Sequence, residues 1–421
     1  MRILFVFPSF PPYKGKPSVT FQRMGSPYVF RCLASVTPDV HDLEFADERF
    51  ERIDYDQEYD IVGISVYTVS SNHAYEIADK FRAQGTTVVL GGCHPTVMPE
   101  EAKQHADAVV IGEAEETWPQ LLKDYEIGKL KPIYRQTKPV DLSLISLSKI
   151  KLREIKTIRN TVGTSRGCPN QCEFCYITNN MLGRIYRTRP INYVREELCN
   201  IKQKHIFFHD ASMTINVNRT KRFFKEIQDL DKKFICCGTV NVLSKDEELL
   251  SLAREAGCVE WFVGFESILQ KNIERIGKRT NIVKEYKNAV KKIHDHGMII
   301  TGSFIFGFDG DKKNIFSETL DAVFDMDLDS GGFHVLTPYP GTPLFTRLER
   351  EGRILTKDWS KYIEMDNVVF QPKNMTTLEL LEGVNWIKRR ILSLNYYTQH
   401  TIKSARLGFY PFLQMTLKGL L

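Results

Sequence analysis

The sequence lacks the features that mark several large classes of protein. No run approaches the roughly 18 apolar residues that cross a membrane, and prolines end the first apolar stretch too early for a signal peptide. The nine cysteines do not resemble the disulfide framework of a short secreted chain. The net charge of +5 is mild, and no basic stripe suits a nucleic acid. We therefore expect a cytoplasmic protein that binds no nucleic acid.

The composition is that of an ordinary globular protein. The chain has 421 residues, of which 42% are hydrophobic and 26% charged, and this length allows two or three domains. No internal repeat is present, and nothing in the pattern specifies an oligomeric state. The weak positive balance is compatible with an anionic substrate or with contact to a membrane surface.

Three cysteines gather in one short stretch, Ser165–Ile177, which reads S-R-G-C-P-N-Q-C-E-F-C-Y-I. Cys168, Cys172 and Cys175 can supply three thiolates to an iron–sulfur cluster, whose irons are held by cysteine sulfur. Three local ligands would leave one iron of a cubane open, and an open position marks a catalytic metal site. Zinc is one alternative, although zinc sites usually show a second ligand pair. Buried, unreactive cysteines are another.

Residues 1–135 alternate short apolar runs with helical patterns, which predicts a parallel sheet covered on both faces. Ligands of such sheets bind beyond the carboxyl ends of the strands. The segments expected there are Pro8–Pro12, Ser65–Ser71, Gly91–Thr96 and Gly112–Glu116. No G-x-G-x-x-G follows the first strand, so the dinucleotide fingerprint is absent. We expect an α/β domain that binds its ligand at this edge.

A second alternation begins after a connector. Gly128–Lys151 is rich in Lys, Pro and Ser without a sustained period, and we assign a linker to residues 136–156. Residues 157–344 hold six β/α units, which predict a partial TIM-type (β/α)6 barrel open on one side. Ser244 is expected to cap the helix Asp246–Ala256. Barrel active sites lie at the carboxyl ends of the strands.

The last part of the chain, residues 345–421, changes character and is expected to be mostly helical. Its end is apolar with scattered basic residues. We expect this end to pack over the open side of the barrel, and the alternative is an interfacial element that meets lipid. Pro411 argues against one uninterrupted amphipathic helix.

The cysteine spacing, with Phe174 directly before the third cysteine, resembles the signature of the radical SAM superfamily. The resemblance implies that Cys168, Cys172 and Cys175 hold a [4Fe-4S] cluster whose open iron binds S-adenosylmethionine. The cluster would donate one electron and cleave S-adenosylmethionine to methionine and a 5′-deoxyadenosyl radical. An electron donor such as a flavodoxin or a ferredoxin is implied with it.

The same resemblance implies contacts to S-adenosylmethionine at the expected strand ends. Asp210 and Glu266 would take the methionine amino group and the ribose hydroxyls, because a carboxylate only accepts hydrogen bonds and both partners donate. Ser303 and Ile305 would flank the adenine. These roles place the cofactor at the mouth of the barrel.

Five further residues near these segments are candidates with less specific support. Arg187 and Arg189 follow the cysteine loop, where a guanidinium could clamp the methionine carboxylate; solvated surface charges are the alternative. Tyr176, His209 and Tyr339 are candidate catalytic residues that would contact the substrate.

The first domain resembles the Rossmann-like cobalamin-binding domain that precedes the radical domain in class B radical SAM enzymes. The matching segments are G-I-S at Gly63–Ser65, G-G-C-H-P-T at Gly91–Thr96 and G-E-A-E at Gly112–Glu115. By this resemblance the nucleotide tail would lie in a slot lined by Ser65, Thr68, Gly91 and Gly92. The mouth of the slot would be bordered by Glu113 and Ala114.

One departure concerns the lower face of cobalamin. Some cobalamin domains supply a cobalt-ligating histidine in D-x-H-x-x-G, but the loop after the first strand here has no histidine. We infer a base-off cobalamin without a histidine from that loop. His73 and His94 are expected to be surface or packing residues.

The whole chain thus resembles a cobalamin-dependent radical SAM enzyme. The commonest activity of that group is C-methylation, in which a methyl group passes from S-adenosylmethionine through methylcobalamin to an unactivated carbon of a substrate radical. Ring formation or carbon–carbon coupling without methyl transfer stays open, as does a non-catalytic protein that binds metal through its cysteines. The substrate would be a small molecule, and the apolar tail favours a hydrophobic or lipid-like one.

Overall fold

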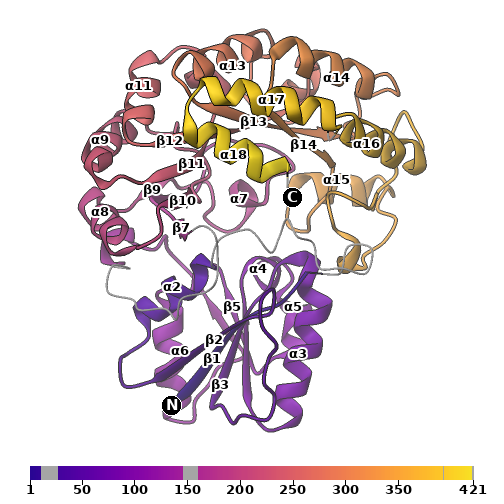
Figure 1. The fold of residues 1–421 in the computed structure, drawn as a ribbon. Coiled ribbons are helices and arrows are strands. Elements are labelled where there is room, and N and C mark those ends of the chain that lie inside the picture. Colours follow the sequence, from indigo (N-terminus) through magenta and orange to yellow (C-terminus); the bar gives the residue numbers. More distant parts are fainter. Residues whose placement is uncertain (11–26, 146–159, 392, 420–421) are drawn as a thin grey trace.

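The computed structural model describes residues 1–10, 27–145, 160–391 and 393–419. It contains two six-stranded sheets, one formed before residue 146 and one after residue 159, and every pairing within them is parallel. Figure 1 shows the amino-terminal half, in indigo and violet, below the second half. The predicted α/β class is confirmed.

The first sheet has the strand order β2-β1-β3-β4-β5-β6. Its strands are β1 (Arg2–Phe7), β2 (Asp42–Asp47), β3 (Ile61–Ser65), β4 (Thr87–Gly91), β5 (Ala108–Ile111) and β6 (Ile133–Arg135). Helices α2 (Tyr28–Val36) and α6 (Thr117–Glu126) pack on one face, and α3 (Ser71–Ala83) and α5 (Pro99–Ala102) on the other. The strands read as continuous apolar runs because both faces are buried.

The short elements of this half are η1 (Thr68–Ser70), α4 (Cys93–Val97), η2 (Lys103–His105) and η3 (Leu142–Leu144). The edge strand β6 lies inside the stretch that we predicted as an unstructured connector, and this prediction was wrong there. Three residues are too few to show a strand period, and β6 exists because Val109–Ile111 pairs with it. Residues 146–156 of the predicted linker lie outside the described residues, as does most of the loop after β1.

The second sheet has the order β14-β13-β12-β11-β10-β7. Its strands are β7 (Asn160–Val162), β10 (His205–Phe208), β11 (Lys233–Gly238), β12 (Cys258–Glu266), β13 (Ile299–Phe306) and β14 (Ser330–Val335). Sequential parallel strands whose two edges stay unpaired form the predicted partial barrel. Residues 157–159 of the predicted first barrel strand lie outside the described part of the chain.

Helices follow the barrel strands and bury their apolar faces against them. They are α8 (Ile191–Asn200), α9 (Val217–Ile227), α10 (Val240–Leu243), α11 (Glu247–Glu255), α12 (Gln270–Arg275), α13 (Tyr286–Asp295) and α14 (Ile315–Met326), with η4 (Gln228–Leu230) and η5 (Val283–Glu285). The expected cap of α11 was wrong. Ser244 ends the short α10, and the Asp246 carboxylate instead accepts from the Leu249 amide at 2.9 Å.

Between β7 and α8 the chain forms a small antiparallel ribbon of β8 (Ser165–Arg166) and β9 (Arg187–Thr188), with the short helix α7 (Tyr176–Asn179) between them. The three clustered cysteines lie in the loop that leads into α7. We call residues 167–175 the cysteine loop. It follows β7, at the carboxyl edge of the barrel sheet.

The tail contains α15 (Pro343–Arg350), η6 (Trp359–Lys361), α16 (Thr377–Ile391), α17 (Leu394–Arg406) and α18 (Phe409–Gly419). Helix α16 lies against the edge strand β14 and joins the barrel core through Leu380, Val384, Ile387 and Ile391. It therefore covers an edge of the open side, a place that we had predicted for the terminal stretch. Within the described residues, no helix combines the length and apolarity needed to cross a bilayer.

Helices α17 and α18 lie instead at the amino ends of the barrel strands. The Tyr396 hydroxyl donates to the carbonyl of Leu328, just before β14. The Tyr410 ring lies 4.8 Å from the ammonium of Lys233, at the start of β11. Pro411 is accommodated because it lies in the first turn of α18, where the missing N–H has no intrahelical partner.

Candidate active site

The carboxyl edges of the two sheets face each other. Tyr176, directly after the cysteine loop, donates its hydroxyl to the carbonyl of Cys93 beyond β4, at 2.7 Å. Gly341, beyond β14, lies so close to α4 that a Cβ there would be 2.5 Å from Val97. Parallel α/β sheets bind ligands at this edge, so ligands of the two sheets would face one another across the seam.

Side chains from α7 hold the cysteine loop in shape. The Asn179 amide nitrogen donates to the carbonyls of Cys172 and Cys175, each at 2.8 Å. The amide of Cys168 donates to the carbonyl of Gly183 at 2.8 Å. The loop is thus fixed from both sides before any metal binds.

The donor set fits an iron–sulfur cluster. Cys172 is buried, while Cys168 and Cys175 are half-buried. Within the described residues no three ligand side chains surround a point for a single ion, and a four-iron cubane takes each thiolate on a different iron. Burial raises the pKa of the Cys172 thiol to about 12, and metal coordination would remove that proton. Phe174 packs into the barrel core with its ring 6.3 Å from that of Phe308.

Asp210 lies buried at the end of β10, directed at the start of the cysteine loop. It accepts from the Thr164 amide at 3.0 Å, from the Thr164 hydroxyl at 2.8 Å and from the Ser165 hydroxyl. Both carboxylate oxygens are therefore engaged by the segment between β7 and the loop. The expected contact of Asp210 to S-adenosylmethionine stays a prediction.

Glu266 ends β12 in a strained conformation, with φ +64°. Non-glycine residues in this left-handed region cost energy and cluster at functional sites. Its carboxylate pairs with the ammonium of Lys278, which also donates to the carbonyl of Gly264 at 2.8 Å. A side chain at Gly264 would collide with both partners. The sequence pattern gave no signal for Lys278, because only folding brings it beneath the end of β12.

Small residues line up across three strands at this mouth. Ser303 of β13 is in register with Gly264 of β12 and Gly332 of β14. These positions alternate with Phe265 and Phe304, whose rings stack outward at 5.4 Å, so they face the barrel lumen. The missing side chains allow other groups to lie close to Ser303: Glu266 and Lys278 occupy the space beside Gly264, and His334 occupies the space beside Gly332. This position is where the adenine was predicted.

The lumen face also carries an exposed aromatic ring. Phe262 of the central strand β12 is 37% exposed, although its neighbours Trp261 and Val263 are fully buried among the helices. Ile305 of β13 is half-buried and lies on the same face as Ser303. His209 follows β10 and is exposed at the same end of the barrel. A wall with an accessible aromatic ring can hold an apolar molecule.

A polar group at the end of β14 includes two residues that sequence reasoning missed. His334 is in register with Ile305, and its Nδ1 lies 3.7 Å from the Glu364 carboxylate without a hydrogen bond. Burial lowers the pKa of His334. The Tyr339 hydroxyl donates to Glu364 at 3.1 Å. Glu364 comes from the tail, and nothing in the local pattern links it to β14.

In the first sheet, Gly92 has φ +99°, and a Cβ there would lie 2.9 Å from the Val66 amide. Ser65 borders the same spot, since that Cβ would be 3.3 Å from its Oγ. The Thr68 hydroxyl lies 3.3 Å from Nδ1 of the fully buried His94. Glycine at position 92 therefore lets the main chains that follow β3 and β4 pack against each other at the carboxyl edge of the sheet.

An ion pair connects the end of β5 to the β8–β9 ribbon, which flanks the cysteine loop. The two terminal guanidinium nitrogens of Arg187, Nη1 and Nη2, donate to the Glu113 carboxylate at 2.7 and 2.8 Å. Burial favours a higher pKa of Glu113, but Arg187 and Arg166 outweigh it and lower that pKa. Ala114 is half-buried and packs with the core of the first sheet. A Cβ at Gly91 would make an ordinary van der Waals contact with Val110, at 3.6 Å. This ion pair crosses the seam between the sheets.

Arg189 has different partners from Arg187. Its buried guanidinium donates to the carbonyl of Gly163 at 2.8 Å and to Glu197 of α8 at 2.6 Å. The structure thus does not bring the two arginines together on one ligand position, and their predicted role as a carboxylate clamp stays a prediction.

Comparison with known proteins matches both halves. A model of the Radical SAM superfamily matches residues 162–323, and a model of the B12 binding domain matches residues 17–122. Bacteriochlorophyllide d C-8(2)-methyltransferase of Chlorobaculum tepidum is 32% identical over 80% of this chain and 79% of its own. Bacteriochlorophyllide d C-12(1)-methyltransferase of the same organism is 31% identical over 85% and 81%.

A solved structure shows the same fold. The radical S-adenosylmethionine methyltransferase TsrM of Kitasatospora setae superposes with a TM-score of 0.69 at 18% identity, covering 83% of this chain and 76% of its own. The sequence relatives support methyl transfer over ring formation, coupling or non-catalytic metal binding. The chain belongs to the cobalamin-dependent radical SAM family, and it is a methyltransferase that uses a [4Fe-4S] cluster, S-adenosylmethionine and cobalamin.

Proposed function

We propose that the chain methylates an unactivated carbon of a hydrophobic, chlorophyllide-like small molecule held between the two sheets. The observation that carries the substrate class is Phe262, a ring 37% exposed on a central strand where packing would normally bury it. A flat apolar substrate can stack on such a ring. The names of the two bacteriochlorophyllide d methyltransferases agree with that chemistry.

The cysteine loop and the barrel mouth have separate tasks in this proposal. When bound, the cluster and S-adenosylmethionine supply radical chemistry and cobalamin supplies a methyl carrier. Cys168, Cys172 and Cys175 hold the cluster. Glu266, held by Lys278, orients S-adenosylmethionine by accepting hydrogen bonds from it.

We place the remaining predicted contacts around the cluster and S-adenosylmethionine. Asp210 supports the methionine end, Ser303 and Ile305 flank the adenine, and the exposed His209 faces the substrate. Tyr176 and Tyr339 already donate to Cys93 and Glu364, so they shape the walls of the site through those bonds.

On the other side of the seam, the first sheet holds cobalamin. Ser65, Thr68, Gly91 and Gly92 line the slot for its nucleotide tail, and Glu113 and Ala114 border the mouth. Support comes from the position of Ser65, Gly91 and Gly92 at the carboxyl ends of β3 and β4, where parallel α/β sheets bind ligands. We also propose a cytoplasmic enzyme that takes its electrons from a flavodoxin or a ferredoxin. Ile402 and Phe409 of the tail are exposed apolar residues, and contact with a membrane surface stays a prediction.

The test is reconstitution of the enzyme with its cluster and cobalamin without oxygen, followed by incubation with S-adenosylmethionine and bacteriochlorophyllide d. Mass spectrometry should find a methylated pigment, with S-adenosylhomocysteine and 5′-deoxyadenosine as joint products. Phe262→Ala should raise the KM for the pigment, whereas Phe324→Ala, an exposed ring on the outer helix α14, should not. Cleavage of S-adenosylmethionine without pigment methylation would reject the proposed substrate class.

A further inference from the structure

A hollow of about 470 Å³ opens on the surface between α7 and α15, directly beside the cysteine loop. Its walls include Asn179, Arg184, Thr342, Thr346, Arg347 and Arg350. No lining residue is acidic, and Arg184, Thr346 and Arg350 are exposed. The hollow is therefore a positively charged depression that solvent reaches freely.

Two of the three arginines that line the hollow are not neutralised by the protein, whereas the third, Arg347, is paired. In the part of the chain that the structure describes, Arg184 and Arg350 have no carboxylate within ion-pair distance, and Arg184 bonds only weakly to Asn179 at 3.3 Å. Thr342 caps the first turn of α15 by accepting from the Phe345 amide at 3.2 Å. The amino end of a helix adds partial positive charge. The rim therefore suits an anionic partner.

One side chain joins this surface to the cluster ligands. The Asn179 carbonyl oxygen accepts from Arg184 in the hollow, while its amide nitrogen donates to the carbonyls of Cys172 and Cys175. A single residue thus lies between the solvent and the main chain of two cysteines that hold the cluster. Few groups separate a partner in the hollow from the cluster.

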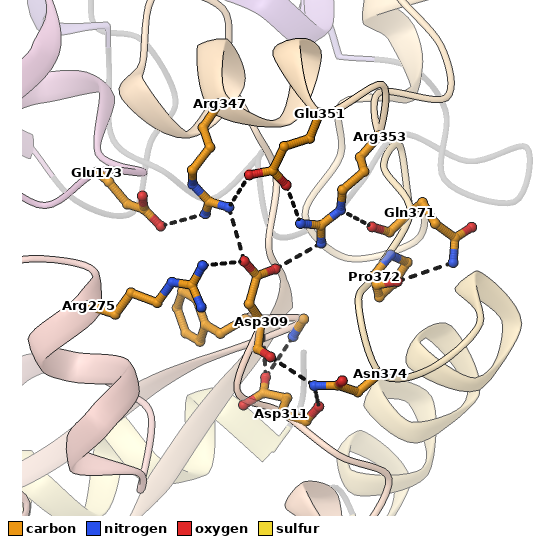
Figure 2. Close-up of polar contacts among 12 residues, drawn as sticks. Glu173, Arg275, Asp309, Asp311, Arg347, Glu351, Arg353, Gln371, Pro372 and Asn374 are labelled. Carbon is orange, nitrogen blue, oxygen red and sulfur yellow. Dashed lines mark hydrogen bonds and ion pairs between the residues drawn. The ribbon is translucent and has the colours of Figure 1, made fainter.

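Helix α15, which forms one wall of the hollow, is also connected to the cysteine loop by charge, and Figure 2 shows these contacts. Arg347 of α15 bridges Glu173 of the cysteine loop and Asp309 beyond β13, each at 3.0 Å. Arg275 and Arg353 also pair with Asp309, at 2.7 and 2.8 Å. Burial acts to raise the pKa of Asp309, but these guanidiniums outweigh it and hold that pKa below its usual value. A partner seated on α15 would therefore keep a fixed distance to the cluster.

We propose that this arginine-lined hollow is the docking site of an acidic one-electron carrier of the flavodoxin type. The inference rests on the proposed function, because only a redox-active cluster needs such a partner. One electron leaves the reduced carrier, which is oxidised by one electron, and enters the cluster beside Asn179; no atom is transferred. Carboxylates on the carrier would pair with Arg184 and Arg350, and such charge pairing steers association more than it sets the final affinity.

The first test measures binding rather than activity. Reduced flavodoxin is titrated against the cluster-loaded, full-length enzyme by interferometry at low and high salt. The variant Arg350→Glu should raise the Kd about tenfold at low salt and weaken its salt dependence, and Arg350→Gln should have a smaller effect. Arg389→Glu, an equally exposed arginine on α16, is the matched control and should bind like the wild type.

Unchanged flavodoxin binding in Arg350→Glu and in Arg184→Glu would overturn the proposal. The second test compares reductants: with dithionite, Arg350→Glu should cleave S-adenosylmethionine at the wild-type rate, and with flavodoxin it should be slower. Equal loss with both reductants, together with a raised KM for the pigment, would make the hollow an anchor for the substrate and would also overturn the proposal. If the wild type fails to cleave S-adenosylmethionine even with dithionite, the proposed function fails independently of the docking result.

Discussion

The two ends of the barrel are built differently, although the same strands run through both. At the carboxyl end, Glu266 has φ +64° and His334 keeps a nitrogen without a hydrogen bond, and Phe262, midway along β12, remains exposed. Each of these features costs stability if considered alone. They persist where cofactors and substrate are expected to bind.

At the amino end the terminal helices cover a buried carboxylate, Asp329, and its histidine neighbours. Asp329 accepts from His294 at 2.7 Å and from the Ile300 amide at 2.9 Å, beneath α17. His400 of α17 stacks on Tyr396 and lies 3.8 Å from Asp329.

Strain occurs at both ends, since Asp231 and Asp327 near the amino end also have left-handed φ and His400 also has a buried nitrogen without a hydrogen bond. The comparison teaches that the two ends differ in cover, because the terminal helices close the amino end and leave the carboxyl end free for ligands.

The largest expected effect comes from removing the cluster ligands at the carboxyl end. Replacing Cys168, Cys172 and Cys175 together by alanine should abolish cleavage of S-adenosylmethionine, because no ligands remain for the cluster. Cobalamin should stay bound to the first sheet, and the midpoint of thermal unfolding should change little. Absorbance spectra and product analysis measure both outcomes. Equal loss of cobalamin would contradict the division of labour between the two sheets.

The next effect concerns a buried charge pair at the same end. Glu266→Gln leaves Lys278 with a neutral partner and should lower the free energy of unfolding by about 2 kcal/mol. It should also weaken binding of S-adenosylmethionine by roughly tenfold, through loss of a charge-assisted hydrogen bond. Isothermal titration and urea unfolding separate the two effects.

The matched control lies in the same strand at its other end. Glu260 accepts from the Thr301 hydroxyl at 2.6 Å, near the start of β12. Glu260→Gln should lower stability without changing the affinity for S-adenosylmethionine. An equal loss of affinity in both variants would show that the two ends do not differ in function.

At the amino end, Asp329 makes stability depend on acid pH. Burial acts to raise its pKa, but its histidine and backbone partners lower it to about 2. Because the pKa of Asp329 is lower in the folded than in the unfolded chain, ionised Asp329 stabilises the fold at pH values above its unfolded pKa. This contribution is roughly 2 kcal/mol at neutral pH and is lost as the pH falls toward 2. Asp329→Asn should remove it while leaving S-adenosylmethionine cleavage intact, as urea unfolding and product assays can measure. Asp325→Asn, which removes only an exposed pair with Lys287, should be near neutral.

The smallest expected effect has the opposite sign and lies beyond β13. Burial raises the pKa of Asp311 to about 6, although it accepts from the Gly307 and Phe308 amides and from Asn272. Its folded form takes up a proton before the unfolded form does, so stability should rise as pH falls from about 6 to about 4. Asp311→Asn keeps an acceptor and should flatten this rise, changing stability at neutral pH by less than about 1 kcal/mol. A rise that persists in the variant would assign it to another group.

The alternation of strands and helices was predictable almost throughout, because each element buries a continuous apolar face whose period shows in the sequence. The exceptions have local reasons. β6 is too short to show a period, and the cap of α11 moved to Asp246 because a separate short helix ends at Ser244. The position of α17 and α18 was not predicted, because the sequence of an apolar helix does not indicate which end of a barrel it covers.

The site divides in the same way. The cysteine motif and the glycines beyond β4 were visible because their spacing along the chain is itself the chemical requirement. Lys278, Asn179 and Glu364 were missed, since each acts on a residue from another segment. The arginines after the cysteine loop were visible, but their partners, Glu113 and Glu197, were not.

By itself, the sequence determined which ligands can be held, because three thiolates on one loop and a pair of glycines after a strand are local properties of the chain. Only the tertiary structure decided which partner each charged side chain has. Arg187 ties the two sheets together, Arg347 fixes the cysteine loop to α15, and Arg350 is left facing solvent. The physical reason is that the partner of a charge is set by distance in space, and such a distance exists only after the chain has folded.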